Sequence, residues 1–191
     1  MRLAFRLAGA AALVVLVVVV VLALINGGGD DDGGGDVDLS TYPYPVQAIE
    51  QIVDRSHFPV GQTYDDYNSN PPTSGPHAAA PAPWGVSDLA VPKETAVHNM
   101  EHAGVVVWYN CNAGPMLETE DCATLRNDLS EVVAPEVGSG RSVLMTPYPG
   151  MDARIALTSW GYLDTFDEFD ADRVRMFIET FECNIDLEGF C

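Results

Sequence analysis

The sequence contains few basic residues. Only nine of its 191 residues are Lys or Arg, against 28 Asp and Glu, and the formal net charge at pH 7 is −19. Proteins that bind nucleic acid need clusters of Lys and Arg to neutralise phosphates, and peripheral proteins need them to dock on anionic lipid. The composition therefore argues against nucleic acid as a partner and against surface binding to anionic membranes.

Motifs that identify common enzyme classes are also absent. The sequence has no phosphate-binding loop, no nucleophile elbow and no dinucleotide fingerprint. It has no C-x-x-C pair, which argues against a thioredoxin-type redox site and against a zinc ribbon. The sequence therefore indicates no catalytic residue, organic cofactor or substrate.

Charge is absent from one long segment. Residues 7–25 form a run of 19 apolar or small residues, and at about 1.5 Å per residue a helix of this length comes close to the roughly 30 Å hydrocarbon core of a membrane. Arg2 and Arg6 precede the run, so the positive-inside rule predicts a cytoplasmic N-terminus and an exported remainder. A cleaved signal peptide is the alternative, but the run exceeds the usual length of about 7–15 residues and no clean cleavage site follows. We expect an uncleaved single-pass anchor in the cell membrane at residues 1–25.

A segment rich in Gly and Asp follows the anchor. Residues 26–36 read NGGGDDDGGGD, a composition that buries no apolar surface and whose like charges repel one another. We therefore interpret residues 26–39 as a flexible linker. Residues 40–191 suffice for one extracytoplasmic domain. Without residues 1–25 the chain has 28 acidic and seven basic residues, a net charge of −21.

The four cysteines agree with export. Cys111, Cys122, Cys183 and Cys191 all lie in the exported part, and structural disulfides persist in oxidising compartments. Four cysteines allow three pairings. We expect the pairing of near neighbours, Cys111 with Cys122 and Cys183 with Cys191, which closes two short loops.

The first part of the domain shows little regular structure. Apolar spacing over residues 46–53 indicates a short helix that ends near Ser56. Residues 57–97 hold seven of the thirteen prolines. Because this stretch also carries aromatic side chains that can pack, we expect an ordered loop region.

Strands are clearer after residue 103. The apolar, β-branched run at residues 104–109 predicts a buried strand. Residues 142–146 and 154–160 predict two more strands, separated by a Pro-Gly turn.

Helical stripes alternate with these strands. One predicted helix covers residues 122–133 and is stopped by Pro135, and a second is capped by Asp170. The order predicts an α+β fold, with a small mixed or antiparallel sheet and helices on one face, preceded by the Pro-rich loop region and the N-terminal transmembrane helix. The expected inner face of the last helix consists of Val174, Phe177, Ile178 and Phe181.

All four histidines lie between residues 57 and 102, most densely in HNMEH at residues 98–102. On a helix, His98 and His102 are neighbours with Glu101 beside them, which matches the H-x-x-E-H pattern of two zinc ligands and a Glu base. On a strand, His98, Met100 and His102 would share one face, and two imidazoles with a thioether would suit copper. A metal-free His pair that hydrogen-bonds the backbone is the third interpretation.

A second concentrated segment supplies one more histidine. Residues 67–77, YNSNPPTSGPH, combine X-Pro bonds, Gly and small polar side chains, which rigidify a loop and fix the position of His77. Met145 and Met151 offer soft thioether ligands, although Met in a strand is usually core. His57 has the least support, because it lies in the weakest motif.

Four motifs occur in order along the domain. They are NSNPPTSGPH at residues 68–77, APWGV at 82–86, VHNMEH at 97–102 followed by GVVVWY at 104–109, and IALTSWG at 155–161. In these motifs the sequence resembles, over about residues 50–183, the domain of unknown function 3105 family (DUF3105). The resemblance implies a bacterial or archaeal protein, usually with one N-terminal membrane segment, and no established activity.

The family pattern resembles His-Asn-Leu-Glu-His-Gly-Gly. This sequence has Met100 in place of that Leu and Ala103 in place of the first Gly, which weighs against Met100 as a required ligand. The resemblance implies functional positions that match here at His77, His98, Glu101 and His102.

These observations favour a histidine site for copper or zinc. We expect His77, His98 and His102 as metal ligands, with Glu101 as a further ligand or as the group that orients them. A metal-free interaction module at the cell surface is the alternative, with Tyr64, Tyr67 and Trp84 as contact residues. A metallohydrolase of the H-x-x-E-H type is the lesser alternative.

Overall fold

The computed structural model describes residues 37–113 and 119–191. The apolar run at residues 7–25 and most of the Gly/Asp linker lie outside this range, so the anchor and the linker stay predictions. Within the described ranges, no helix has both the length and the apolar character that crossing a membrane requires.

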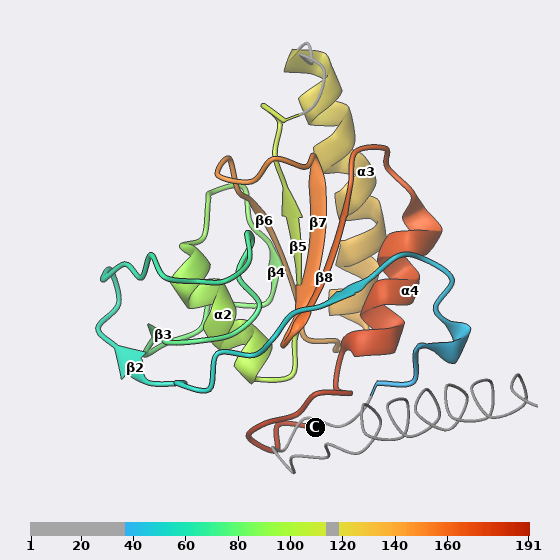
Figure 1. The fold of residues 1–191 in the computed structure, drawn as a ribbon. Coiled ribbons are helices and arrows are strands. Elements are labelled where there is room, and N and C mark those ends of the chain that lie inside the picture. Colours follow the sequence, from blue (N-terminus) through green and yellow to red (C-terminus); the bar gives the residue numbers. More distant parts are fainter. Residues whose placement is uncertain (1–36, 114–118) are drawn as a thin grey trace, which may run out of the picture. The chain divides into compact units, whose positions relative to one another are not determined.

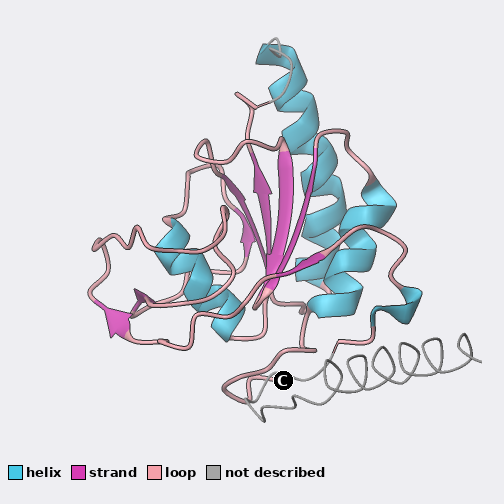
Figure 2. Cartoon of the chain, in the orientation of Figure 1, coloured by secondary structure: helices cyan, strands magenta, loops and turns pink. Residues whose placement is uncertain are grey.

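The described residues form an α+β fold around a mixed sheet (Figures 1 and 2). Strand β5 lies inside the sheet and pairs parallel with β6 and antiparallel with β7. In the described part of the chain the strand order is β1-β8-β7-β5-β6-β4. The strands are β1 (Gln47–Ala48), β4 (Gly85–Val86), β5 (Val105–Tyr109), β6 (Val143–Pro147), β7 (Ile155–Ser159) and β8 (Tyr162–Phe166).

Helices cover both faces of this sheet. On one face, Val105 and Val107 pack against α3 (Thr119–Gly138) and α4 (Ala171–Phe181). On the other face, Val106 and Trp108 pack with residues of α2 (Lys93–Glu101), and Figure 1 shows α2 on the opposite side of the sheet from α3 and α4. The prediction of helices on one face is therefore wrong. The physical reason is that β5 is apolar on both sides, so both of its faces need a cover.

Several predicted elements are confirmed. Strands β5, β6 and β7 lie where the apolar runs predict them. Helix α4 is capped by Asp170, whose carboxylate accepts hydrogen bonds from the backbone N–H groups of Asp172 and Arg173. The predicted inner face of α4 is fully buried.

The expected cysteine pairs also form. Cys111 pairs with Cys122 and Cys183 pairs with Cys191, with Cα–Cα distances of 5.2 and 5.7 Å. The second pair closes a loop at the end of the chain.

The helix predicted at residues 46–53 is wrong. This segment contains β1, which pairs with β8, and no helix. The N–H of Ile49 donates to the carbonyl of Gly161, and the N–H of Ile52 donates to Oγ of Ser74. Val46 and Ile49 pack against the core while Val53 is exposed. The backbone forms hydrogen bonds with residues distant in the sequence, in place of those between residues four apart in a helix.

The predicted stop at Pro135 is also wrong. Helix α3 continues through Pro135 to Gly138. A proline removes its own N–H from the helical ladder and its ring crowds the carbonyl four residues earlier, yet the carbonyl of Pro135 still accepts from the N–H of Ser139 at 2.9 Å. Val137 packs on the core and stabilises this last turn.

Strand β8 was not predicted from the apolar pattern, because a buried Asp interrupts it. Asp164 is 1% exposed. Its carboxylate accepts hydrogen bonds from the Tyr42 hydroxyl and the Arg173 guanidinium, which compensates the burial of its charge.

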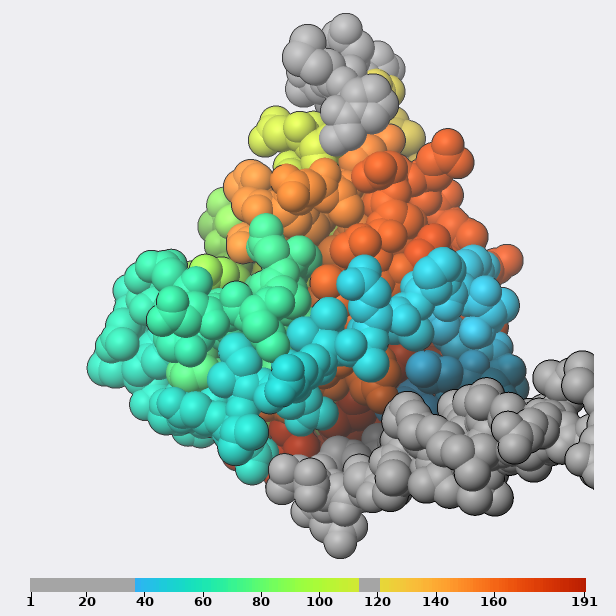
Figure 3. Space-filling model, viewed as in Figure 1, coloured from blue at the N-terminus to red at the C-terminus, as the bar shows by residue number. Residues whose placement is uncertain are grey.

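The Pro-rich segment packs along α2. Asn99 of α2 joins the two, because its side chain bonds both the backbone N–H and the carbonyl of Ala82 at 2.9 Å. The segment contains a second, two-stranded sheet in which β2 (His57–Phe58) runs parallel to β3 (His77–Ala78). In Figure 3 this part of the chain forms a continuous layer, coloured teal.

Candidate metal centre

The HNMEH motif lies on a helix. It occupies the last turn of α2, where His98 and Glu101 are helical and His102 is the C-cap. The helical geometry places these three side chains toward one side. The next residue, Ala103, has a φ of 61°, the left-handed conformation that suits the Gly of the family pattern.

The alternative in which HNMEH forms a strand is wrong. The observed helix therefore rules out the shared face of His98, Met100 and His102 that a strand would form. Met100 is fully buried in the core with Trp108, so it does not share a surface with His98 and His102. Met145 and Met151 likewise belong to apolar core clusters. None of these sulfur atoms is placed as a ligand beside the histidines.

Two short parallel strands bring the other two histidines together. In the pairing of β2 with β3, His57 stands opposite His77, and their ring centroids lie 4.6 Å apart. His77 is fully buried, whereas the His57 side chain is 43% exposed. The cluster therefore has a closed inner side and one face toward solvent.

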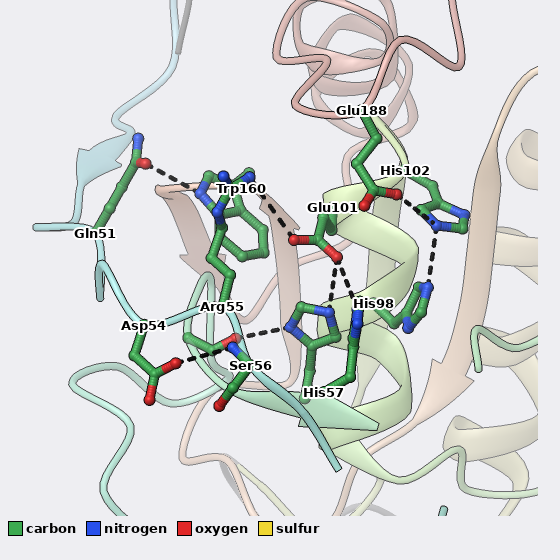
Figure 4. Close-up of polar contacts among 12 residues, drawn as sticks. Gln51, Asp54, Arg55, Ser56, His57, His98, Glu101, His102, Trp160 and Glu188 are labelled. Atoms are coloured by element: carbon green, nitrogen blue, oxygen red, sulfur yellow. Dashed lines mark hydrogen bonds and ion pairs between the residues drawn. The ribbon is translucent and has the colours of Figure 1, made fainter. Parts of the chain in front are cut away.

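The side chains converge at the end of α2. Ligand nitrogens of His57, His77 and His98 all lie within 4.8 Å of one another. Oε2 of Glu101 lies 2.8 Å from Nε2 of His77 and 3.2 Å from Nε2 of His57. Figure 4 shows Glu101, His98 and His102 projecting from α2, with His57 approaching from the neighbouring segment.

Backbone carbonyls fix which nitrogens are free. Nδ1 of His77 lies 2.7 Å from the carbonyl oxygen of Gly75, and Nδ1 of His98 lies 2.6 Å from that of Ala78. A carbonyl only accepts, so both Nδ1 atoms carry hydrogen and donate. The Nε2 atoms remain as the free positions, an arrangement typical of histidines that bind metal.

The contact between His77 and Glu101 needs a proton or a metal cation between its two atoms. With Nδ1 donating to Gly75, a neutral His77 presents the lone pair of Nε2 to a carboxylate oxygen. Burial lowers the pKa of His77, and the neighbouring His57 and His98 lower it further, against the opposing effects of Gly75 and Glu101. Burial thus disfavours a proton on His77, and a metal cation there would satisfy both atoms.

His102 lies at the other side of His98. Its Nε2 is 3.0 Å from Nε2 of His98 and 3.1 Å from Oε2 of Glu188. The ring of Phe190 stacks on it with a centroid distance of 3.9 Å. Partial burial, followed by the effect of His98, lowers the pKa of His102.

The structure brings together a somewhat different set from the predicted one. His77, His98 and Glu101 lie together, and His102 contacts His98, Glu188 and Phe190. His57, the least supported histidine, joins the compact group. Glu188 was missed, because nothing in the sequence indicates that the loop closed by the last disulfide returns to α2.

The aromatic residues of the interaction-module hypothesis serve internal contacts. The Tyr67 hydroxyl donates to the carbonyl of Pro76 at 2.6 Å, and the Tyr64 ring packs edge-on against Tyr67. Trp84 packs closely over Gly104, where an added Cβ would come within 2.3 Å of the indole. These side chains hold the Pro-rich segment to α2 and β5.

Comparisons with known proteins identify the family. The model of the family described as "Protein of unknown function (DUF3105)" matches residues 60–188, which is more than half of the chain. Comparisons with curated proteins and with solved structures give no match. The chain therefore belongs to the DUF3105 family.

Proposed function

We propose that this protein binds a divalent transition metal ion, zinc or copper, through the histidine cluster. The observation that supports the proposal most strongly is the contact of His77 with Glu101. There, a free imidazole nitrogen and a carboxylate oxygen lie 2.8 Å apart in a buried position. His57 points its Nε2 at the same oxygen. Two imidazoles and one carboxylate form a common ligand set for zinc.

The donor set favours Zn²⁺ or Cu²⁺ over Cu⁺. All four cysteines are paired in disulfides, so none offers a thiolate. The methionines considered as ligands lie in the core. Nitrogen and oxygen donors suit Zn²⁺ and Cu²⁺, whereas Cu⁺ prefers sulfur.

The charges around the site support the binding of a cation. The chain beyond residue 25 has a net charge of −21, and such a field raises the local concentration of cations. Arg55 opposes this, because its Nη1 lies 3.7 Å from Oε1 of Glu101. Its side chain is 45% exposed and can turn toward solvent when an ion binds.

The proposed location is the outer side of the cell membrane. Two disulfides fit an oxidising compartment, and the apolar run at residues 7–25 fits a single anchor with its N-terminus in the cytoplasm. The proposal covers binding and not a reaction. Glu101 would have to serve as the base of an H-x-x-E-H hydrolase, but its Oε2 contacts both His57 and His77.

Elemental analysis tests this proposal. The full-length chain, purified without an affinity tag, is loaded with zinc or copper, desalted and analysed. We expect at least one retained equivalent, and a lower metal content in the double variant His57→Ala with His77→Ala. Glu131→Gln, at an exposed position of α3, is the control. Equal metal content in the double variant and the wild type would refute the assignment.

A further inference from the structure

Ligand atoms of His57, His77 and His98 lie within 4.8 Å of one another, but the shortest contacts of the free nitrogens divide them into two groups. Nε2 of His57 and of His77 both face Oε2 of Glu101; these three residues are the inner ligand set. Nε2 of His98 faces Nε2 of His102, at 3.0 Å, and His102 in turn faces Glu188. His98, His102 and Glu188 are the outer ligand set, and each set has two imidazoles and one carboxylate.

We propose that the outer ligand set binds a second divalent metal ion, so that the protein holds two. This inference rests on the proposed function, because the inner set would hold the first ion. It assigns every histidine of the chain to an ion, and it adds Glu188 from the C-terminal loop. Figure 4 shows that Glu188 and His98 approach the same nitrogen of His102 from different directions.

Hydrogen bonds alone cannot satisfy all the acceptor atoms of the outer ligand set. The Nδ1–H of His98 is engaged by the carbonyl of Ala78, so a neutral His98 has only a lone pair at Nε2. Nε2 of His102 faces this lone pair and also the carboxylate of Glu188. A single N–H on His102 cannot point at both acceptors, whereas one cation between the three atoms would satisfy them all.

The spacing of the outer atoms fits a shared ion. Two ligand atoms on a tetrahedral zinc, each at about 2.0–2.1 Å, lie roughly 3.3 Å from each other. The observed distances are 3.0 Å between the two histidine nitrogens and 3.1 Å between His102 and Glu188. Each of these two pairs therefore needs to open by only about 0.2–0.3 Å to share an ion.

The C-terminal loop holds Glu188 in place. The disulfide between Cys183 and Cys191 closes the loop. Inside it, the carboxylate of Asp186 accepts hydrogen bonds from the backbone N–H groups of Gly189, Phe190 and Cys191. The Phe190 ring stacks on His102. The carboxylate is thus presented by a braced loop, as a preorganised ligand should be.

The carboxylate of the outer set is more exposed than that of the inner set, where only the His57 side chain, at 43%, faces solvent. The side chains of His102 and Glu188 are 18% and 36% exposed, whereas the Glu101 side chain is 3% exposed. A second ion would therefore keep a coordination position open to water or to an incoming ligand, which a buried structural ion lacks.

Zinc stoichiometry tests the second position. Zinc is titrated into the metal-free, full-length chain by calorimetry, and retained zinc is counted after desalting. We expect two equivalents in the wild type and one in His102→Ala with Glu188→Gln. The control Glu131→Gln should keep two. The equivalent retained by the double variant shows that this variant is folded.

A single substitution guards against a variant that fails to fold. Glu188→Gln should weaken the binding of the second zinc equivalent at least tenfold and leave the affinity for the first unchanged. One equivalent in the wild type, or unchanged binding in both variants, overturns the second position and leaves the proposed function standing. No retained zinc in the wild type overturns both.

Discussion

Nε2 of His77 lies 2.8 Å from Oε2 of Glu101, although the two residues belong to different elements, the short strand β3 and the helix α2. The His77 ring is fixed by the carbonyl of Gly75, and Glu101 is fixed by the last turn of α2. The backbone thus positions a buried nitrogen and a buried oxygen so that both face the same point. Substitutions in either element should therefore affect metal binding.

Glu101→Gln should weaken zinc binding at least tenfold. The amide keeps the size of the side chain but removes the negative charge that faces His57 and His77, and changes near metal ligands commonly cost about 10–100-fold in affinity. Competition with a chromophoric chelator measures the change. Equal affinities for Glu101→Gln and the exposed control Glu131→Gln would contradict the assignment of Glu101 as a ligand.

Bound metal should stabilise the domain against heat. An ion present at about 100 times its Kd adds about 2.7 kcal/mol, and in domains of this size each kcal/mol raises Tm by about 2–4 °C. We therefore expect a rise of about 5–11 °C over the chelated protein, read by differential scanning fluorimetry. His77→Ala should reduce the rise, because it removes the contribution of the inner ion; an equal rise in that variant would place the stabilising ion elsewhere.

Gly75→Ala should destabilise the loop that holds His77. Gly75 has a φ of +118°, and an added Cβ would lie 3.1 Å from Ile52 and 3.3 Å from Tyr67. Gly61 also has a positive φ, of +92°, but an added Cβ would meet nothing within 4 Å. Strained φ values cost about 1–3 kcal/mol, so both variants should lose unfolding free energy. Only in Gly75→Ala does the added Cβ also crowd Ile52 and Tyr67. Urea denaturation should show the larger loss of unfolding free energy, with weaker zinc binding, for Gly75→Ala; equal losses would mean that the crowding is relieved.

Asn99→Leu should separate the Pro-rich segment from α2. Asn99 is fully buried and makes two hydrogen bonds to the backbone of Ala82, and leaving buried partners unsatisfied costs about 1–3 kcal/mol. The control is Asn127→Leu, at an exposed position of α3. Chemical denaturation should show a loss of this size for Asn99→Leu alone. Similar stability of the two variants would mean that other contacts hold the segment.

The metal-free domain should lose stability on acidification. Burial lowers the pKa of His77 and of His102 below the ordinary value of about 6.5, so below this pH the unfolded chain takes up protons before the folded one does. The stabilising contribution is complete above pH 6.5 and declines as the pH falls through the lowered pKa values. Tm of the chelated protein, measured between about pH 8 and pH 5.5 around the ordinary His pKa, should fall at the acid end. A Tm that stays constant over this interval would contradict the burial of a neutral His77.

Local patterns were enough to predict part of this architecture. Strands β5, β6 and β7 are continuous apolar runs, and α4 combines an Asp cap with an apolar stripe, so short-range sequence specifies them. The closeness of His98 and Glu101 could be predicted because both belong to one five-residue motif, HNMEH. The helical or extended state of this turn could not be decided from five residues.

Other features depend on contacts between distant segments. His57 joins the site through the pairing of β2 with β3, and Glu188 joins through the loop that the last disulfide closes. Neither pairing leaves a periodic signal in the sequence. Strand β8 was hidden because its buried Asp164 is compensated by Tyr42 and Arg173, which are remote in sequence.

Anomalous diffraction from crystals of the zinc-loaded protein locates the ion of the inner ligand set. Data collected at the zinc absorption edge should show a peak about 2.0–2.2 Å from Nε2 of His57, Nε2 of His77 and Oε2 of Glu101, the bond lengths that zinc takes with such ligands. Ordered density for these side chains without an anomalous peak between them, in crystals grown with excess zinc, would contradict the account.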